Sequence, residues 1–264
     1  MNQRLDAALA ERGLARSRSH AHQLIAEGAV SLNGLNVTKP STPVREDDEL
    51  SVVAEHGYVS RAALKLVAAL DEFAVNVEGA FALDAGASTG GFTQVLRERG
   101  ARRVLAVDVG HGQLSPTIRL DDRVIVVEGE NVRDLTANRV RDLTHGEELP
   151  TIVVADLSFI SLELVIPALI SSSAPNAEYV LLIKPQFEVG RNGVREGIVR
   201  DPVARADAVE RVLWAAHDAG LNVAGLSRSP ILGAHGNVEV VAWLSHRMGT
   251  SPTEWSDRIR EVTA

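Results

Sequence analysis

The first 55 residues carry two helical patterns followed by short runs in which apolar and polar residues alternate. Leucines at helical spacing predict a helix from Leu5 that Gly13 ends, and Ser17 is a suitable N-cap for a second helix reaching Gly28. An Asn33-Gly34 pair between apolar runs is the signature of a tight β-hairpin, and residues 50–53 read as another strand. These patterns predict a small α+β domain over residues 1–55.

From residue 58 onward, apolar runs of strand length alternate with amphipathic helical patterns. Such alternation favours a doubly wound, mainly parallel sheet with helices on both faces. Too few residues separate the last two strands to hold a helix, so we expect the seventh strand to run antiparallel. Residues 56–59 then form a linker and residues 60–264 a second domain. The expected strands lie at 81–86, 103–110, 123–129, 151–156, 179–184, 221–227 and 238–244, and the clearest helices at 91–99, 160–170 and 202–218.

Composition removes several classes of protein. The chain has 264 residues, 45% of them apolar, without a run of the roughly 18 apolar residues that a membrane helix needs. Charges begin at Arg4, which argues against a secretory signal, so we expect a cytoplasmic protein. We also expect a monomer. The chain has no cysteine, and its eight histidines lack ligand-like spacing, so we expect no metal site. His20 and His22 are expected to be solvated on a helix.

The net charge of −8 argues against a nucleic-acid partner, but its distribution qualifies that reading. Residues 1–45 carry six arginines and lysines against three acidic residues, a local excess of about +3. Arg12, Arg16 and Arg18 gather at a helix boundary, which suits contact with phosphates, although a solvated helix face would give the same pattern.

Residues 3–53 resemble the RNA-binding domain named after ribosomal protein S4. The resemblance rests on the pattern RLD..L...GLARSR..A..LI..G.V..NG..V.KPS, in which arginines, glycines and the Asn-Gly turn all fall in place. In that family the second helix and the arginines before it lie against RNA. The resemblance therefore implies RNA contacts from Arg4, Arg16, Arg18 and Lys39.

A glycine-rich turn, LDAGASTGGF, follows the first strand of the second domain. Glycine lets the backbone approach a ligand closely, and the next helix offers its N-terminal amides. The spacing differs from the G-x-G-x-x-G of dinucleotide sites, and Asp84 suits the ammonium and sulfonium of S-adenosylmethionine better than a pyrophosphate. The turn also matches a hydrolase nucleophile motif, which would need a late histidine such as His235. We favour S-adenosylmethionine, held by Asp84, Gly86, Ala87, Ser88, Gly90, Gly91 and Phe92.

Two further strand ends suit the nucleoside part of that cofactor. Asp108 ends the second strand, where an acid commonly accepts both ribose hydroxyls, although it could simply shape the turn before Gly110. The third strand ends in VEGEN, so either Glu128 or Asn131 could contact the adenine edge, and we favour Asn131.

Three later strand ends carry ionisable residues, namely Asp156, Lys184 and Glu239. Lys65 lies on the helix before the first strand. The chain has 24 arginines but three lysines, which indicates a requirement for an amine at these positions. Burial or a second nearby ammonium lowers the pKa of a lysine, and the lysine can then act as a base. Each residue alone could instead snorkel or form a salt bridge. Together the four are similar to the Lys-Asp-Lys-Glu tetrad of ribose 2'-O-methyltransferases.

An S4-type domain followed by VSRAALKL, LDAGASTGGFT, ADLSFISL, KPQFEVG and GNVE resembles the TlyA family of ribosomal RNA 2'-O-methyltransferases, also called haemolysins. The resemblance implies a Rossmann-like class I methyltransferase domain of the FtsJ-like kind, with ribosomal RNA and ribosomal subunits as partners. It assigns the tetrad to Lys65, Asp156, Lys184 and Glu239, places Asp156 and Phe159 at the cofactor, and brings Arg61 to RNA.

The same resemblance implies a cytidine of 23S rRNA as the target and, in a longer subtype, also 16S rRNA. The helical pattern of SPTEWSDRIREVTA at the C-terminus favours that subtype. The linker sequence from 56 to 59 departs from the R-x-W-V of some members, so a switching role for it is in doubt. Two alternatives stay open: a membrane-active haemolysin, and a ribosome-assembly factor without catalysis.

Overall fold

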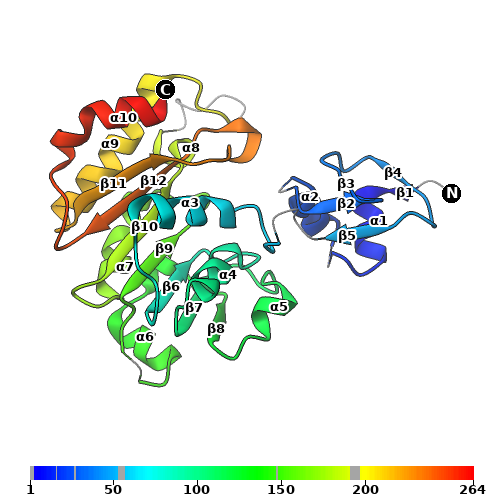
Figure 1. Cartoon of the computed structure of the whole chain (residues 1–264), viewed down its shortest axis with the longest axis horizontal. Helices are drawn as coiled ribbons and strands as arrows, with labels where there is room; N and C mark the ends of the chain where they lie inside the picture. Colours follow the sequence, from blue (N-terminus) through cyan, green and yellow to red (C-terminus); the bar gives the residue numbers. More distant parts are fainter. Residues whose placement is uncertain (1–2, 16, 27, 53–56, 147, 191–196) are drawn as a thin grey trace. The chain divides into compact units, whose positions relative to one another are not determined.

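The computed structural model describes residues 3–15, 17–26, 28–52, 57–146, 148–190 and 197–264. The chain divides into two compact units, Met1–Ala63 and Leu64–Ala264 (Figure 1). This division falls a few residues beyond the predicted linker, of which residue 56 lies outside the described residues. The limits 1–55 and 60–264 for the two domains stay a prediction.

The N-terminal unit contains the predicted helices and hairpin. Asn33 and Gly34 have φ of 51° and 79°, the left-handed conformations that a tight two-residue turn requires, and they join two antiparallel strands. The core is formed by side chains such as Leu5, Leu9 and Ile25, which are fully buried. The pattern did not predict the short pair β1–β4. The elements are β1 (Gln3–Arg4), α1 (Leu5–Glu11), α2 (Arg18–Ala26), β2 (Val30–Leu32), β3 (Leu35–Asn36), β4 (Pro43–Val44) and β5 (Leu50–Val52).

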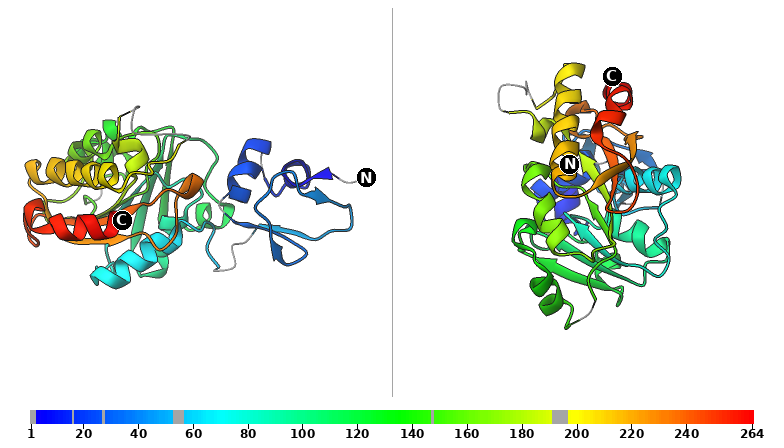
Figure 2. Two further views of the ribbon diagram at one scale, coloured as in Figure 1. Left: turned by 90° about the horizontal axis from the view of Figure 1, so that it is seen from above. Right: turned by 90° about the vertical axis from the view of Figure 1, so that its left-hand side faces the viewer.

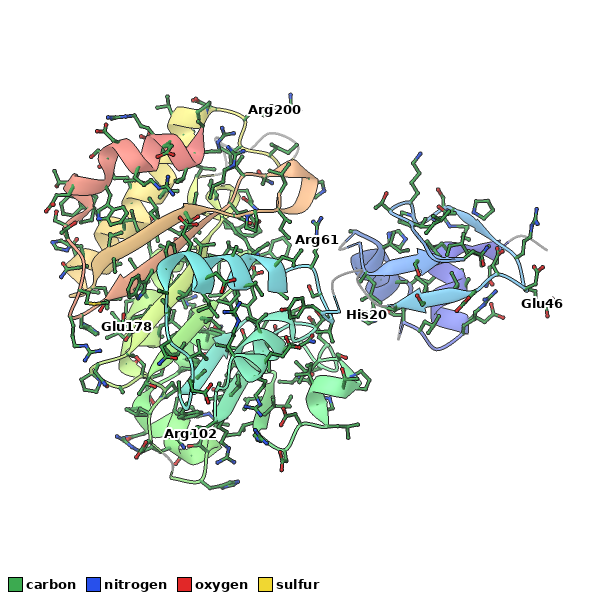
Figure 3. All side chains as sticks on the ribbon, in the orientation of Figure 1. His20, Glu46, Arg61, Arg102, Glu178 and Arg200 are labelled. Carbon is green, nitrogen blue, oxygen red and sulfur yellow. The ribbon has the colours of Figure 1, made fainter. Side chains whose placement is uncertain are left out.

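The described residues of the second unit form a seven-stranded sheet in the order β11-β12-β10-β9-β6-β7-β8. The five consecutive strands from β10 to β8 pair with one another in parallel, whereas β12 is antiparallel to both β10 and β11, as predicted. Glu178, labelled in Figure 3, lies at the start of β10 and accepts hydrogen bonds from Trp243 and Ser245 on β12. The strands are β6 (Phe81–Ala85), β7 (Arg103–Asp108), β8 (Val124–Glu128), β9 (Ile152–Ala155), β10 (Glu178–Ile183), β11 (Asn222–Arg228) and β12 (Val240–Ser245).

Helices cover both faces of this sheet. Side chains of α6, α7, α9 and α10 share one core with the strands, and the right-hand view of Figure 2 shows α3 on the opposite face from α7. Alternate residues of a strand point to opposite faces, so Leu83 and Ala85 join that core whereas Asp84 faces the other side. The helices are α3 (Ala63–Phe73), α4 (Gly91–Glu98), α5 (Pro116–Arg119), α6 (Ala137–Leu143), α7 (Ile166–Ser171), α8 (Pro185–Glu188), α9 (Pro202–Asp218) and α10 (Ser256–Thr263).

One predicted helix is wrong as a single element. Residues 160–170 contain the short 3-10 helix η2 (Leu162–Leu164) and then α7, with Val165 between them. Pro167 explains the break, because proline lacks an N–H and its fixed φ favours the first turn of a new helix. In the part of the chain that the structure describes, no helix has the length and apolar character needed to cross a membrane.

Candidate active site at the rim of the sheet

The structure brings together the four residues of the predicted tetrad. Lys65 on α3 places its Nζ 2.7 Å from Glu239 Oε2 and 3.6 Å from Asp156 Oδ2. Lys184, the residue after β10, places its Nζ 2.6 Å from Asp156 Oδ1. Strands β9, β10 and β12 are neighbours, so Asp156, Lys184 and Glu239 reach the same rim of the sheet. The predicted proximity is confirmed.

Asp156 is the shared counter-ion of two lysines. Its side chain is 14% exposed, and those of Lys65 and Lys184 are 8% and 10% exposed. Burial alone would raise the pKa of Asp156, but the ammonium groups of Lys184 and Lys65 outweigh it and hold the pKa below its usual value. At neutral pH the site therefore holds an ionised carboxylate between two amines.

Two polar neighbours of the tetrad were missed by the sequence analysis. Lys184 Nζ donates to Ser158 Oγ at 2.9 Å, and Gln186 Nε2 donates to Glu239 Oε1 at 3.3 Å. Both residues belong to motifs that the sequence displays, ADLSFISL and KPQFEVG. Ser158 and Gln186 each lie two residues after a tetrad residue, and this closeness in sequence could have drawn attention to them. No periodic pattern, however, indicates which neighbouring side chain points toward the site.

Glu239 is also contacted by the loop that precedes β12. It is 2% exposed, and a Cβ on Gly233 would overlap its carboxylate, so the backbone of residue 233 lies directly against this group. Asn237, also buried, accepts from Val199 N and donates to the Gly197 carbonyl, which anchors the loop before β12. The backbone of this loop thus adds to the contacts that Lys65 and Gln186 make with Glu239.

The loop between β9 and η2 is tied to α8. Glu188 is 8% exposed and accepts hydrogen bonds from Ser161 Oγ at 2.6 Å and from Leu162 N at 3.0 Å, while burial raises its pKa. Phe159 lies in the sequence between Asp156 and the residues bound by Glu188; it has a φ of 65° and is 91% exposed. Its ring centroid lies 5.1 Å from that of Phe187. The predicted contact of Phe159 with the cofactor stays a prediction.

The glycine-rich turn has the close approach expected of a ligand cradle. Gly86 has a φ of 86° and its backbone lies against Asp156, since a Cβ there would be 2.9 Å from the Asp156 carbonyl oxygen. Gly86 N and Ala87 N donate to the Val107 carbonyl, which joins the turn to the end of β7. Gly90 has a φ of 96° and N-caps α4. Gly90 has no side chain with which to cap the first amides of the helix.

Asp84 fits a cationic ligand group. It is completely buried, its Oδ2 accepts from Thr93 Oγ1 at 2.6 Å, and its Oδ1 has no hydrogen-bond partner among the described residues. Burial raises the pKa of Asp84 to about 7. A nearby ammonium or sulfonium would favour the ionised form. The orphaned oxygen and the turn beside it fit S-adenosylmethionine.

The two predicted nucleoside contacts lie at neighbouring strand ends. Asp108 accepts from Ser88 N at 2.8 Å and Gly110 N at 2.7 Å, so both oxygens already shape the loops around them. Asn131 N-caps the 3-10 helix η1 (Val132–Asp134) with its side-chain oxygen. Glu128 accepts from Gln113 N and Arg119. Contacts of Asp108 and Asn131 with a cofactor stay predictions.

The predicted RNA contacts of the N-terminal unit divide into three groups. Arg4 and Arg18 both pair with the buried Asp6, and their side chains are 50% and 62% exposed. Lys39 is exposed, and position 16 lies outside the described residues. Arg61 is partly exposed and precedes α3. Arg12 instead donates to carbonyls of the β4–β5 turn.

His22 is exposed, as expected for a solvated position on a helix, but it also has a partner that the sequence did not reveal. Its Nε2 lies 2.8 Å from Asp6 Oδ2. Spacing along α2 could not reveal this contact, because its partner lies on another helix, 16 residues earlier.

Comparisons with known proteins agree with this geometry. Residues 58–246 match the model of the FtsJ-like methyltransferases, and residues 3–50 match that of the S4 domain. The 16S/23S rRNA (cytidine-2'-O)-methyltransferase TlyA of Mycobacterium tuberculosis is 49% identical over 244 residues, which cover 91% of this chain and 89% of that protein. Hemolysin A of Brachyspira hyodysenteriae is 40% identical, with 90% of this chain and 98% of that protein covered.

A solved structure extends the likeness to nearly the whole chain. A protein of Streptococcus thermophilus, provisionally classed as a hemolysin, superimposes with a TM-score of 0.78 at 39% identity. The match covers 99% of this chain and 94% of that one.

Proposed function

Because this chain belongs to the FtsJ-like methyltransferases, and among them to the TlyA family, we propose that it methylates the 2'-hydroxyl of a cytidine ribose in ribosomal RNA. The methyl donor is S-adenosylmethionine. We propose 23S rRNA as one substrate and 16S rRNA as the second, since the similar protein of Mycobacterium tuberculosis is named for both. The enzyme acts on ribosomal subunits in the cytoplasm; its predicted monomeric state stays a prediction.

Asp156 between two lysines carries the proposal for the mechanism. Methylation forms a bond between the ribose oxygen and the methyl carbon, breaks the carbon–sulfur bond and releases the hydroxyl proton. Lys184 is assigned the role of the base that accepts the hydroxyl proton, because it contacts one carboxylate whereas Lys65 contacts two. Asp156 and Lys65 orient this amine and balance its charge, and Glu239 holds Lys65. Positioning and local electrostatics account for most of the rate in such a transfer.

The cofactor is assigned to the turn beside Asp156. When bound, S-adenosylmethionine supplies an activated methyl group on a sulfonium. Asp84 would hold its ammonium, and Asp108 its ribose hydroxyls. The close approach of Gly86 to the Asp156 backbone supports placing the methyl donor next to the tetrad.

Lysine substitutions test the assignment. Lys184→Ala and Lys184→Arg should both lower kcat by about 100-fold or more. A general base contributes a factor of about 10²–10⁴ to the rate, and a guanidinium does not lose its proton to become a base. The measurement is transfer of radiolabelled methyl groups to 23S and 16S rRNA, followed by mapping of 2'-O-methyl positions. Binding of S-adenosylmethionine and thermal unfolding, measured on the same variants, control for folding.

Activity retained by Lys184→Arg would show that the amine is not the base. Methylation absent from wild-type reactions on intact subunits and free rRNA would contradict the proposed function itself. In that case binding of S-adenosylmethionine decides between an assembly factor and a different methyl acceptor.

The name of the Brachyspira relative raises membrane lysis as a second function. Purified protein should release no dye from liposomes of phosphatidylcholine and phosphatidylglycerol. Dye release at protein concentrations that support methylation would establish lysis as an additional activity.

A further inference from the structure

The N-terminal unit contains one buried carboxylate surrounded by exposed cationic groups. Asp6 is 0% exposed. Its Oδ1 accepts from Arg4 Nε and Ala7 N, both at 3.0 Å. Its Oδ2 accepts from Arg4 Nη2 at 3.2 Å and Arg18 Nη2 at 2.9 Å, and it lies 2.8 Å from His22 Nε2. One side chain from β1 and two from α2 thus meet at a single carboxylate on α1.

Because Asp6 is ionised, each of its partners must donate a hydrogen bond to it. The hydrogen bond from Arg4 lowers the pKa of Asp6 far below its usual value, and Arg18 and His22 add to the effect against the opposing effect of burial. An ionised carboxylate only accepts hydrogen bonds, so His22 must donate from Nε2. Each cation therefore points one edge of its side chain inward at Asp6.

The other edges of the three side chains face solvent. Arg4, Arg18 and His22 have exposed fractions of 50%, 62% and 52%. A guanidinium has five N–H donors, of which Arg4 gives two to Asp6 and Arg18 gives one. Two arginines against one carboxylate leave a local charge of +1, or +2 when His22 is protonated. A cluster with fixed donors and net positive charge matches a phosphate group.

The loop that carries Lys39 adjoins the same place. Asp6 N donates to the Pro40 carbonyl at 3.1 Å, and Leu5 N donates to the Thr42 carbonyl at 2.8 Å. The exposed Lys39 lies at the start of this loop. The backbone therefore brings a further cation toward the cluster.

We propose that Asp6 is a positioning residue for an RNA phosphate site formed by Arg4, Arg18 and His22, and that His22 is a phosphate contact. The inference rests on the proposed function, because it requires the N-terminal unit to bind ribosomal RNA. It assigns to an acidic residue a role that favours RNA binding. Bulk electrostatics predicts the opposite, since an acid repels a polyanion.

Asp6→Asn in the full-length protein separates these two views. Binding of a 23S rRNA transcript is measured by filter retention from 50 to 300 mM KCl. If Asp6 positions the arginines, Asp6→Asn weakens binding about 10-fold and reduces the slope of log affinity against log salt by about 1. Asp47→Asn is the matched control: it removes an equal charge from an exposed position of the same unit and should bind equally or slightly more tightly.

A double substitution distinguishes positioning from a general effect on folding. In an Arg4→Gln/Arg18→Gln background, adding Asp6→Asn should change RNA affinity less than 2-fold, because the two arginines through which Asp6 mainly acts are gone and only His22 remains. A persisting 10-fold effect would overturn the positioning role. Binding by Asp6→Asn as tight as that by Asp47→Asn, with an unchanged salt slope, would overturn it as well.

His22→Ala tests the third member and does not depend on the folding of Asp6→Asn. Position 22 is half-exposed on a helix, where alanine is well tolerated. This variant should bind RNA about 3-fold more weakly at pH 6, and wild-type affinity there would overturn the role of His22. Absence of salt-dependent RNA binding by the wild type would instead contradict the proposed function.

Discussion

At the scale of single residues, the site is defined by charges that burial would not allow in isolation. Asp156 stays ionised because two amines lie beside it. The fully buried Asp84 has no amine partner among the described residues, and burial raises its pKa to about 7. The two carboxylates are close enough for Asp156 to raise the pKa of Asp84 further. The charge of Asp156 is neutralised by lysines of the protein, whereas Asp84 is available to a cationic ligand.

The raised pKa of Asp84 predicts a pH-dependent cost to stability. The folded protein binds a proton at Asp84 up to about pH 7, whereas the unfolded chain releases it near pH 4, so stability falls as pH rises between these values. Asp84→Asn should remove this decline. At pH 8 the variant should be more stable than the wild type by about 1–3 kcal/mol, while its affinity for S-adenosylmethionine falls at least 10-fold.

Thermal unfolding from pH 4 to 9, with and without the cofactor, measures both effects of Asp84→Asn. The difference between the variant and the wild type isolates the contribution of Asp84 from that of every other ionisable group. A variant that is destabilised equally at every pH would contradict the assignment of the titration to Asp84.

At the scale of elements, strand ends place the reacting groups and the following loops hold them. The loop before β12 presses the backbone of Gly233 against Glu239, and Glu188 on α8 ties down the loop after β9. Asp156 and Lys184 lie at the beginnings of two segments that Glu188 connects. The geometry of the tetrad therefore depends on residues that do not contact the reacting atoms.

Gly233→Ala should disturb catalysis through Glu239. The added methyl group would overlap the carboxylate, displace it from Lys65 and lower kcat by about 10-fold or more, with a smaller change in the KM for rRNA. Gly190→Ala is the control, since a Cβ at that position meets nothing within 4 Å. Methyl transfer rates and melting temperatures of both variants check the prediction; equal kcat in the two would show that Glu239 tolerates displacement.

At the scale of the whole molecule, the chain joins an N-terminal unit whose first 45 residues are cationic to an acidic catalytic unit. The overall net charge is −8, yet residues 1–45 carry an excess of positive charge. Because long-range attraction of a polyanion depends on local as well as net charge, we expect the N-terminal unit to provide most of the salt-dependent affinity for rRNA.

Substitutions in the two units should therefore change different kinetic constants. Arg18→Gln should raise the KM for rRNA about 5- to 10-fold with little change in kcat, whereas Lys65→Ala should lower kcat strongly with little change in KM. Steady-state methylation of 23S rRNA at two salt concentrations measures both constants. A loss of kcat in Arg18→Gln at saturating rRNA would contradict the division of labour.

The sequence by itself determined the elements and the classes of residue at the site. Periodicity located both helices of the N-terminal unit, the Asn-Gly hairpin and all seven strands, because these depend on local spacing and on turn residues. The connection between the last two strands is too short to hold a helix, and this alone predicted that β12 is antiparallel. The scarcity of lysine drew attention to Lys65 and Lys184, which the structure brings to the same aspartate.

Only the tertiary structure decided which neighbours support those residues. Ser158, Gln186 and Gly233 contact the tetrad across loops whose paths no repeating pattern encodes. In the N-terminal unit, Asp6 counted in the sequence as one charge against RNA binding, and His22 as a solvated side chain. The fold buries Asp6 beside His22, because a carboxylate that is excluded from water needs hydrogen-bond partners, and tertiary structure decides which side chains provide them.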